Sequence, residues 1–201
     1  MSTVPGADDR TAALIRAAAV EAMAANGYFG TSVRDIAARA GLSPGAMYHH
    51  FSDKHALLAD ILDRGMDRLL RATEEALYAA DNHPAERLRA IVSVHVRMHM
   101  DRQAESFLGN TELRSLESGA RELVLSKRDA QQRMFDRVVA DGTRQGLFAT
   151  RHPREAARWI VAACTSVATW YRPAGELSPE QIVTRYQAIA LDTVGYRSED
   201  R

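Results

Sequence analysis

The sequence lacks nearly every feature that would place the protein outside the cytoplasm. One cysteine, Cys164, stands among 201 residues, so a disulfide framework within the chain is excluded. The opening stretch MSTVPGADDRTAA has no apolar segment of the kind found in secretory signal peptides. The longest notably apolar run, WIVAAC at 159–164, is far shorter than the roughly 20 residues that span a bilayer. We therefore expect a cytoplasmic protein without a membrane anchor.

The sequence also has no excess of charge of either sign. Its 26 basic and 26 acidic residues give a formal net charge of zero, which argues against a protein that coats nucleic acid electrostatically. A protein that docks a small patch on DNA is not excluded. Basic residues are almost all arginine, with Lys54 and Lys127 the only lysines. The apolar fraction of 46% is enough for a buried core.

Signatures of common catalytic sites are missing as well. We find no nucleophile elbow, no phosphate-binding loop and no paired carboxylates in a plausible cleft. We therefore expect neither an enzyme nor a cofactor, and an enzyme on an all-helical scaffold remains as a remote alternative.

What the sequence does contain is helical periodicity along nearly its whole length. Ser32 with Asp35 forms a capping box, and Ser178 with Gln181 forms a second one. We predict an all-α fold of about nine helices, with a small N-terminal domain over 1–55 and a larger domain over 56–201. The predicted helices include 32–40, 43–50, one starting at 52, 84–102, 107–117, 120–145, one starting at 153, and 178–194.

Two short predicted helices, 32–40 and 43–50, are joined by Gly41-Leu42. Small Ala37 stands where the helices would cross, and Ile36 and Met47 would point inward. This pattern is typical of a helix-turn-helix, whose second helix enters a major groove. Taken alone, the spacing fits an ordinary helical hairpin equally well.

The outward side of the second helix favours the DNA-binding alternative. Its first turn carries small residues, so its backbone and its N–H groups can approach a phosphate. Tyr48 and the neighbouring histidines can add donors there, and Lys54 begins the next helix. Adjacent histidines lie about 100° apart on a helix, so His49 and His50 cannot comfortably share a metal ion.

Residues 11–62 resemble the DNA-binding region of the TetR family of bacterial repressors. The matching residues are Ala18-Ala19, Gly27, Thr31 to Ala37, Ala40 to Ser43, Tyr48, His50-Phe51, Lys54 and Ala56 to Leu58. The resemblance implies that Thr31, Ser32 and Arg34 contact the backbone or base edges. It implies that Ser43, Gly45, Ala46 and His49 face the groove, and that Tyr48, His50 and Lys54 bind phosphates. Departures from the family pattern are Met23, Ala46 and His55.

The DNA-binding domain over 1–55, here called the reading head, has no net positive charge to strengthen its binding to DNA. Two copies bound side by side would raise the affinity, so we expect a homodimer on a palindromic DNA operator. The last two predicted helices, with their small residues and an apolar stripe, would form the dimer surface. The fifth to eighth predicted helices, in a ligand-binding and dimerisation domain over 56–201, would enclose a pocket for a small-molecule effector. The candidate lining residues, for each of which plain core packing is the competing interpretation, are Val96, Met100, Phe107, Met134, Phe135, Val138, Trp159 and Trp170.

His95 and His99 lie at i and i+4, a spacing that can bind zinc from one helix face. No third ligand is evident, so a metal-responsive regulator is the alternative function and a polar role is favoured. The stretches 128–148 and 170–182 resemble a branch of the TetR family that responds to acyl-CoA thioesters in fatty-acid or steroid breakdown. That resemblance implies a small hydrophobic or acyl-CoA-type effector that releases a repressor from its operator.

Overall fold

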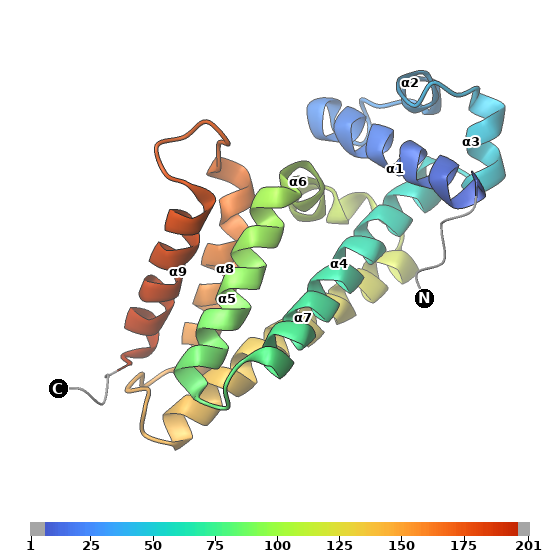
Figure 1. The fold of residues 1–201 in the computed structure, drawn as a ribbon. Helices are drawn as coiled ribbons and strands as arrows, with labels where there is room; N and C mark the ends of the chain where they lie inside the picture. The colour runs from blue at the N-terminus through green and yellow to red at the C-terminus, as the bar shows by residue number, and fades with distance from the viewer. Residues whose placement is uncertain (1–6, 197–201) are drawn as a thin grey trace. The chain divides into compact units, whose positions relative to one another are not determined.

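The structure, a computed structural model, describes residues 7–196, and within this range the regular elements are helices apart from one isolated bridge between Phe148 and Tyr196 (Figure 1). The predicted all-α class is confirmed for the described residues. In chain order the helices are α1 (Ala7–Asn26), α2 (Val33–Arg39), α3 (Pro44–His50), α4 (Lys54–Ala79), α5 (Pro84–Asp101), α6 (Gln103–Thr111), the 3-10 helix η1 (Leu113–Ser115), α7 (Ser118–Arg144), α8 (Pro153–Trp170) and α9 (Pro179–Val194).

Helix boundaries with a local capping signal lie close to their predicted positions. The capping boxes at Ser32 and Ser178 are both present, and α9 ends at Gly195 in the left-handed region (φ 64°). The sixth helix differs, because it starts at Gln103 and ends at Thr111 instead of covering 107–117. The Gln103 amide donates to the carbonyls of Ala168 and Tyr171, and this long-range contact fixes a break that no proline or glycine marks.

The chain divides into two compact units, each built from two stretches of the sequence. The first unit contains the chain up to Gly65 together with Ala104–Val124, and the second contains Met66–Gln103 and the chain from Leu125 onward. Helices α4 and α7 each begin in the first unit and continue into the second. Residues 1–6 and 197–201 of the two predicted domains lie outside the described residues.

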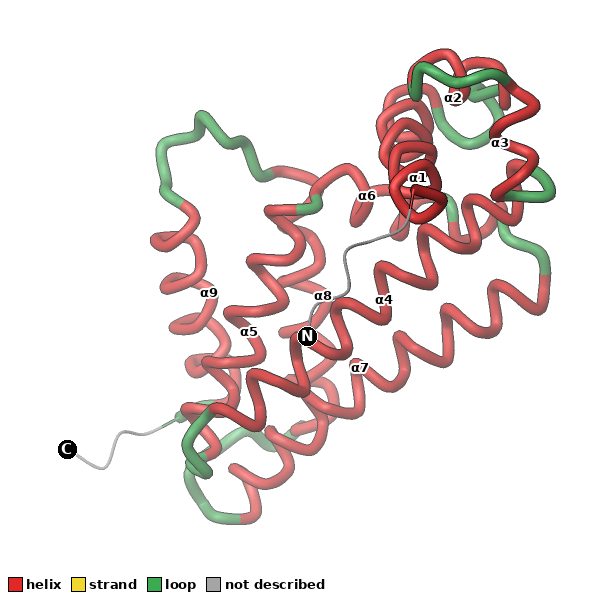
Figure 2. Tube along the Cα trace, turned by 45° about the vertical axis from the view of Figure 1, so that its right-hand side comes forward, coloured by secondary structure: helices red, strands yellow, loops and turns green. Residues whose placement is uncertain are grey.

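In the first unit, α1 packs against α2 and α3 (Figure 2). Its apolar stripe is buried, with Ile15 and Ala19 both at 0% exposure and Met23 at 1%. Ile36, Ala37 and Met47 close this core from the two short helices. The predicted inward face of the hairpin is therefore the observed one.

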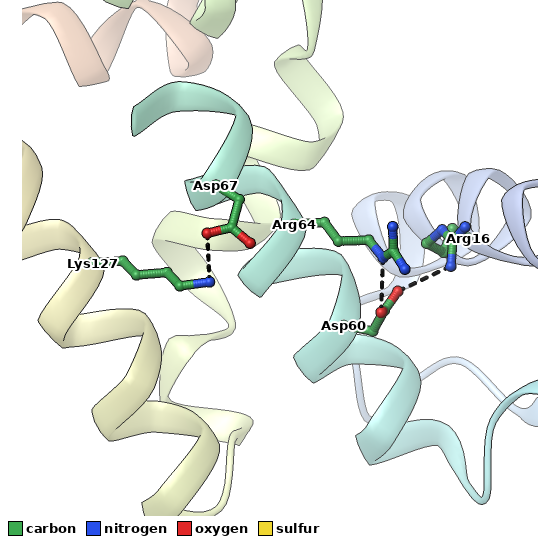
Figure 3. Close-up of polar contacts among 5 residues, drawn as sticks. All are labelled: Arg16, Asp60, Arg64, Asp67 and Lys127. Atoms are coloured by element: carbon green, nitrogen blue, oxygen red, sulfur yellow. Dashed lines mark hydrogen bonds and ion pairs between the residues drawn. The ribbon is translucent and has the colours of Figure 1, made fainter. Parts of the chain in front are cut away.

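In the second unit, α5 packs against both α8 and α9 (Figures 1 and 2). Their apolar faces share one hydrophobic core with the later part of α7, which contributes Phe135, Val138 and Val139. Lys127 Nζ on α7 lies 2.6 Å from Asp67 Oδ1 on α4, and this ion pair ties the two long helices together within the unit (Figure 3).

Among the described residues, none of the helices combines the length and the apolar character that a membrane crossing requires.

Gly142 on α7 supplies a test of this packing. A Cβ at this position would overlap the ring of Phe148, which is only 2% exposed. We expect Gly142→Ala to lower the free energy of unfolding by about 1–3 kcal/mol, as overpacked cores do. Gly119→Ala is the matched control, because nothing lies within 4 Å of its Cβ position on the same helix. Thermal denaturation of both variants should separate them, and equal or higher stability of Gly142→Ala would contradict this packing.

Candidate DNA-binding interface

The two short helices of the first unit meet at a tight turn. Gly41 adopts φ +69°, and the Leu42 amide donates back to the Ala37 carbonyl at 2.9 Å. A residue with a side chain would strain this backbone, so glycine allows α3 to leave α2 at the observed angle. Ala37, fully buried, keeps the crossing close. The hairpin is therefore a helix-turn-helix in its local geometry.

Helix α3 presents its beginning to solvent. The Ser43 hydroxyl caps the helix by accepting from the Ala46 amide at 3.2 Å, and Pro44 occupies the first position. Ser43, Gly45 and His49 are exposed, and Ala46 is half-buried. A Cβ on Gly45 would meet only the Ser43 hydroxyl, at 3.8 Å. Another surface can therefore approach the backbone of this first turn closely.

Tyr48 and Arg34 extend this open face. Tyr48 is 54% exposed although it follows the fully buried Met47, so its phenol stands beside the helix and is accessible. Arg34 on α2 is exposed as well. His50 is half-buried, and its Nε2 lies 4.0 Å from the Asp8 carboxylate, a weak contact that needs a protonated ring.

Thr31 and Ser32 lie at the start of α2, but their side chains are engaged internally. Thr31 is 1% exposed, and its hydroxyl donates to the carbonyls of Ala22 (3.1 Å) and Gly27 (2.9 Å) near the end of α1. This placement does not fit the expected DNA contact, because burial removes the hydroxyl from any external surface. Ser32 is exposed, and its hydroxyl forms the capping box with Asp35. The same bonds hold the pKa of the Asp35 carboxyl below its usual value.

Lys54 is placed differently from its expected role on a phosphate. Its Nζ donates to the carbonyls of Tyr28 and Thr31, each at 2.7 Å, and lies 4.2 Å from the centre of the Tyr28 ring. These contacts use the ammonium to hold the loop between α1 and α2 on the first turn of α4. The structure therefore makes Lys54 an internal tether of the reading head.

Four further side chains, Arg16, Asp60, Arg64 and His55, hold the helices of the first unit together, and the sequence did not indicate this role for them. Asp60 on α4 accepts from Arg16 on α1 at 3.1 Å and from Arg64, one turn on, at 2.9 Å (Figure 3). His55, which the family pattern marked only as a departure, accepts the amide of Glu117 at 2.7 Å through Nε2. Only the Asp60 and Arg64 spacing was visible in the sequence; the other partners are 44 and 62 residues apart.

His95 and His99 lie in the second unit and do not converge on a metal. His95 is buried, with Nε2 lying 3.0 Å from the Thr165 hydroxyl, and the His99 Nδ1 donates to the His95 carbonyl at 2.8 Å. The two rings are stacked, 4.5 Å apart and 6° from parallel. Desolvation lowers the pKa of His95 well below its ordinary value, and the charge of His99 adds to this. Among the described residues no group of three potential metal ligands is found.

The residues expected to line a pocket differ in burial and do not all lie in the same unit. Val96, Met100, Phe135 and Val138 belong to the core of the second unit. Met134 is half-buried, whereas Phe107 is 38% exposed and belongs to the first unit. Trp159 and Trp170 on α8 are 67% and 43% exposed, which fits an external contact better than the lining of a pocket.

Family models match both parts of the chain. One described as bacterial regulatory proteins, tetR family, matches residues 15–61, and one described as tetracyclin repressor-like, C-terminal domain, matches residues 81–194. The HTH-type transcriptional repressor KstR2 of Mycobacterium tuberculosis is 30% identical over 170 residues, which is 84% of either chain.

Solved structures agree with these matches. A regulatory protein in the tetR family from Rhodococcus RHA1 has a TM-score of 0.88 and 34% identity, covering 94% of this chain and 99% of that chain. The ketosteroid transcriptional regulator KstR2 of Mycobacterium tuberculosis has a TM-score of 0.86 at 25% identity, covering 97% and 98%. AibR, solved with isovaleryl coenzyme A and operator DNA, has a TM-score of 0.82 at 22% identity over 93% and 100%, a likeness of fold.

Substitution of Lys54 distinguishes a tether from a phosphate contact. Lys54→Met leaves two carbonyls without their charged donor, so we expect a loss of about 2–3 kcal/mol in the free energy of unfolding. Arg34→Met, which removes an exposed cation from α2, should change it by less than about 0.5 kcal/mol. Urea denaturation measures both. A Lys54→Met protein as stable as the wild type would show that the ammonium is free for DNA.

Proposed function

Since the chain belongs to the TetR family of bacterial regulatory proteins, we propose that it is a cytoplasmic repressor that binds a palindromic DNA operator as a homodimer and leaves it when a small effector binds. The observation that carries the proposal is the open first turn of α3. Ser43, Gly45 and His49 are exposed there, and Met47, on the opposite face of the helix, is buried in the core. A short helix of this kind fits a major groove with its N-terminal residues on base edges.

The individual contacts follow from the placement of the side chains. His49 can donate to a base edge, Ala46 offers an apolar contact such as a thymine methyl accepts, and the Tyr48 hydroxyl suits a phosphate. Arg34 supplies a cation from the neighbouring helix. We assign no DNA contact to the Thr31 hydroxyl, and the two carbonyl bonds of Lys54 give it a role inside the domain.

A homodimer through α8 and α9 is supported by an exposed stripe on α8. Trp159, Ala162, Ser166 and Trp170 are all exposed and recur at helical spacing, so two aromatic anchors flank a strip of small side chains. Ile189 on α9 is 50% exposed, and the Trp170 ring stacks near Tyr186 at 6.3 Å. Exposed tryptophans beside small residues are typical of an interface, and a second copy supplies the same surface in return.

The effector class proposed is a small hydrophobic molecule or an acyl-CoA-type thioester. Support comes from the similarity to KstR2, whose solved structure is described as that of a ketosteroid transcriptional regulator, and from the apolar core of the second unit. Helices α4 and α7 both run from the second unit into the first. A shift of α7 caused by an effector would reach the first unit, where the Glu117 amide donates to His55.

DNA recognition is tested by selecting genomic fragments with the purified protein and measuring affinity for the selected operator against salt. We expect a palindrome with half-sites one or more helical turns, about 34–36 Å each, apart. Arg34→Ala should reduce the salt slope by about one per subunit, because one phosphate contact is lost on each half-site. Arg39→Ala is the control, since its guanidinium pairs with Glu21 at 3.2 Å. Equal slopes for wild type and Arg34→Ala would refute this interface.

The dimer surface is tested by Trp159→Glu. A carboxylate at the centre of an apolar contact costs its desolvation, so we expect the variant to sediment as a monomer at micromolar concentration where the wild type is a dimer. Tyr78→Glu, which alters a side chain 94% exposed on α4, should remain dimeric. A wild type that is already monomeric, or a Trp159→Glu dimer of unchanged affinity, would remove α8 from the interface.

A further inference from the structure

All the polar residues that are buried in the described part of the second unit gather in one place. Thr73, His95, His99 and Gln131 are 0%, 2%, 8% and 2% exposed, and they come from α4, α5 and α7. Gln131 Nε2 lies 3.0 Å from the Thr73 hydroxyl and 3.4 Å from His95 Nδ1. The edge of His95 also meets the Phe135 ring, 5.6 Å between centres. A polar cluster is therefore embedded in an apolar core.

The direction of each hydrogen bond in the cluster is set by Thr73. Its hydroxyl donates to the Leu69 carbonyl at 2.8 Å, so toward Gln131 it can only accept. Gln131 must then present its NH₂ group to Thr73, and the same group faces Nδ1 of His95. Nδ1 is consequently the unprotonated nitrogen, and Nε2–H donates to the Thr165 hydroxyl at 3.0 Å.

With these hydrogen-bond directions, one buried acceptor in the cluster has no donor. Oε1 of Gln131 receives no hydrogen bond from any described group of the protein, although the atom is fully buried. A buried acceptor without a donor destabilises a fold, so the cluster is not explained by stability. The contact from Gln131 to His95 is long at 3.4 Å, so the 3.0 Å bond to Thr73 is the one that fixes the orientation of the amide.

We propose that Gln131 Oε1 accepts a hydrogen bond from a hydroxyl group on the effector, so that the effector is a mainly apolar alcohol anchored at this cluster. The inference rests on the proposed effector function and narrows its chemistry. The donor is neutral, because the core around the cluster is apolar and a cation would lose its hydration there. The remainder of the molecule is apolar, because Phe135 and the core around it surround the cluster.

The test uses matched probe pairs that differ in a single donor. 1-Decanol, 4-butylcyclohexanol and decahydro-2-naphthol, each beside its methyl ether, are added to the purified full chain, and the melting temperature is followed. We expect at least one alcohol to raise the melting temperature more than its ether does. We expect Gln131→Met to abolish that difference and, without ligand, to melt about 2–4 °C above the wild type as the unpaired amide is removed.

Gln132→Met is the matched control, because Gln132 lies next to Gln131 on α7 and its amide bonds Asp136 on the same helix at 2.9 Å. It should keep the preference for alcohol over ether. The inference is overturned if no alcohol in the panel exceeds its ether, or if Gln131→Met keeps the preference.

A separate measurement of operator release by the active alcohol keeps the two proposals apart. Failure of the probe pairs with intact operator binding removes only the hydroxyl anchor. Probe binding that depends on Gln131 but leaves operator affinity unchanged keeps the anchor and contradicts the effector-release mechanism.

Discussion

The structure of the reading head depends on the hydrogen bonds that the Lys54 ammonium group donates to two backbone carbonyls. Lys54 Nζ holds the Tyr28 and Thr31 carbonyls at 2.7 Å each, so the loop between α1 and α2 is tied to the first turn of α4. Helix α3 has only seven residues, and an isolated helix of that length is not stable in water. Its orientation must come from its neighbours, and the tethered loop leads directly into α2, against which α3 packs.

Further contacts at the beginning of α4 also hold the reading head together. Asp60 joins α4 to α1 through Arg16, so α1 and the loop that leads to α2 are both fixed to the beginning of α4. Helix α4 continues into the second unit, as does α7, whose start bonds His55 through the Glu117 amide. Two long helices that continue into the second unit therefore contact the head within the first unit.

Local signals in the sequence correctly predicted the features that depend on residues close together in the chain, such as helix ends and turns. The capping boxes at Ser32 and Ser178, the proline starts and the small residues at the turn all gave correct helices and the correct hairpin. The internal bonds of Thr31 and Lys54 could not be predicted, because their acceptors are backbone carbonyls that only the fold brings close. The spacing of His95 and His99 suggested a shared face, whereas the polar network around them depends on Thr73 and Gln131, which only the fold brings close.

The central claim, that the open turn of α3 enters the major groove at two matched half-sites, is tested most directly by DNA cleavage from Ala46→Cys. A thiol-reactive cleavage reagent should attach to the thiol that this substitution introduces and not to Cys164. Burial raises the pKa of the Cys164 thiol to about 12 and makes that thiol unreactive. The account predicts cuts clustered in the major groove of the selected operator, at two sites related by its two-fold axis. Cuts outside the operator, or spread evenly along it, would show that another surface binds DNA.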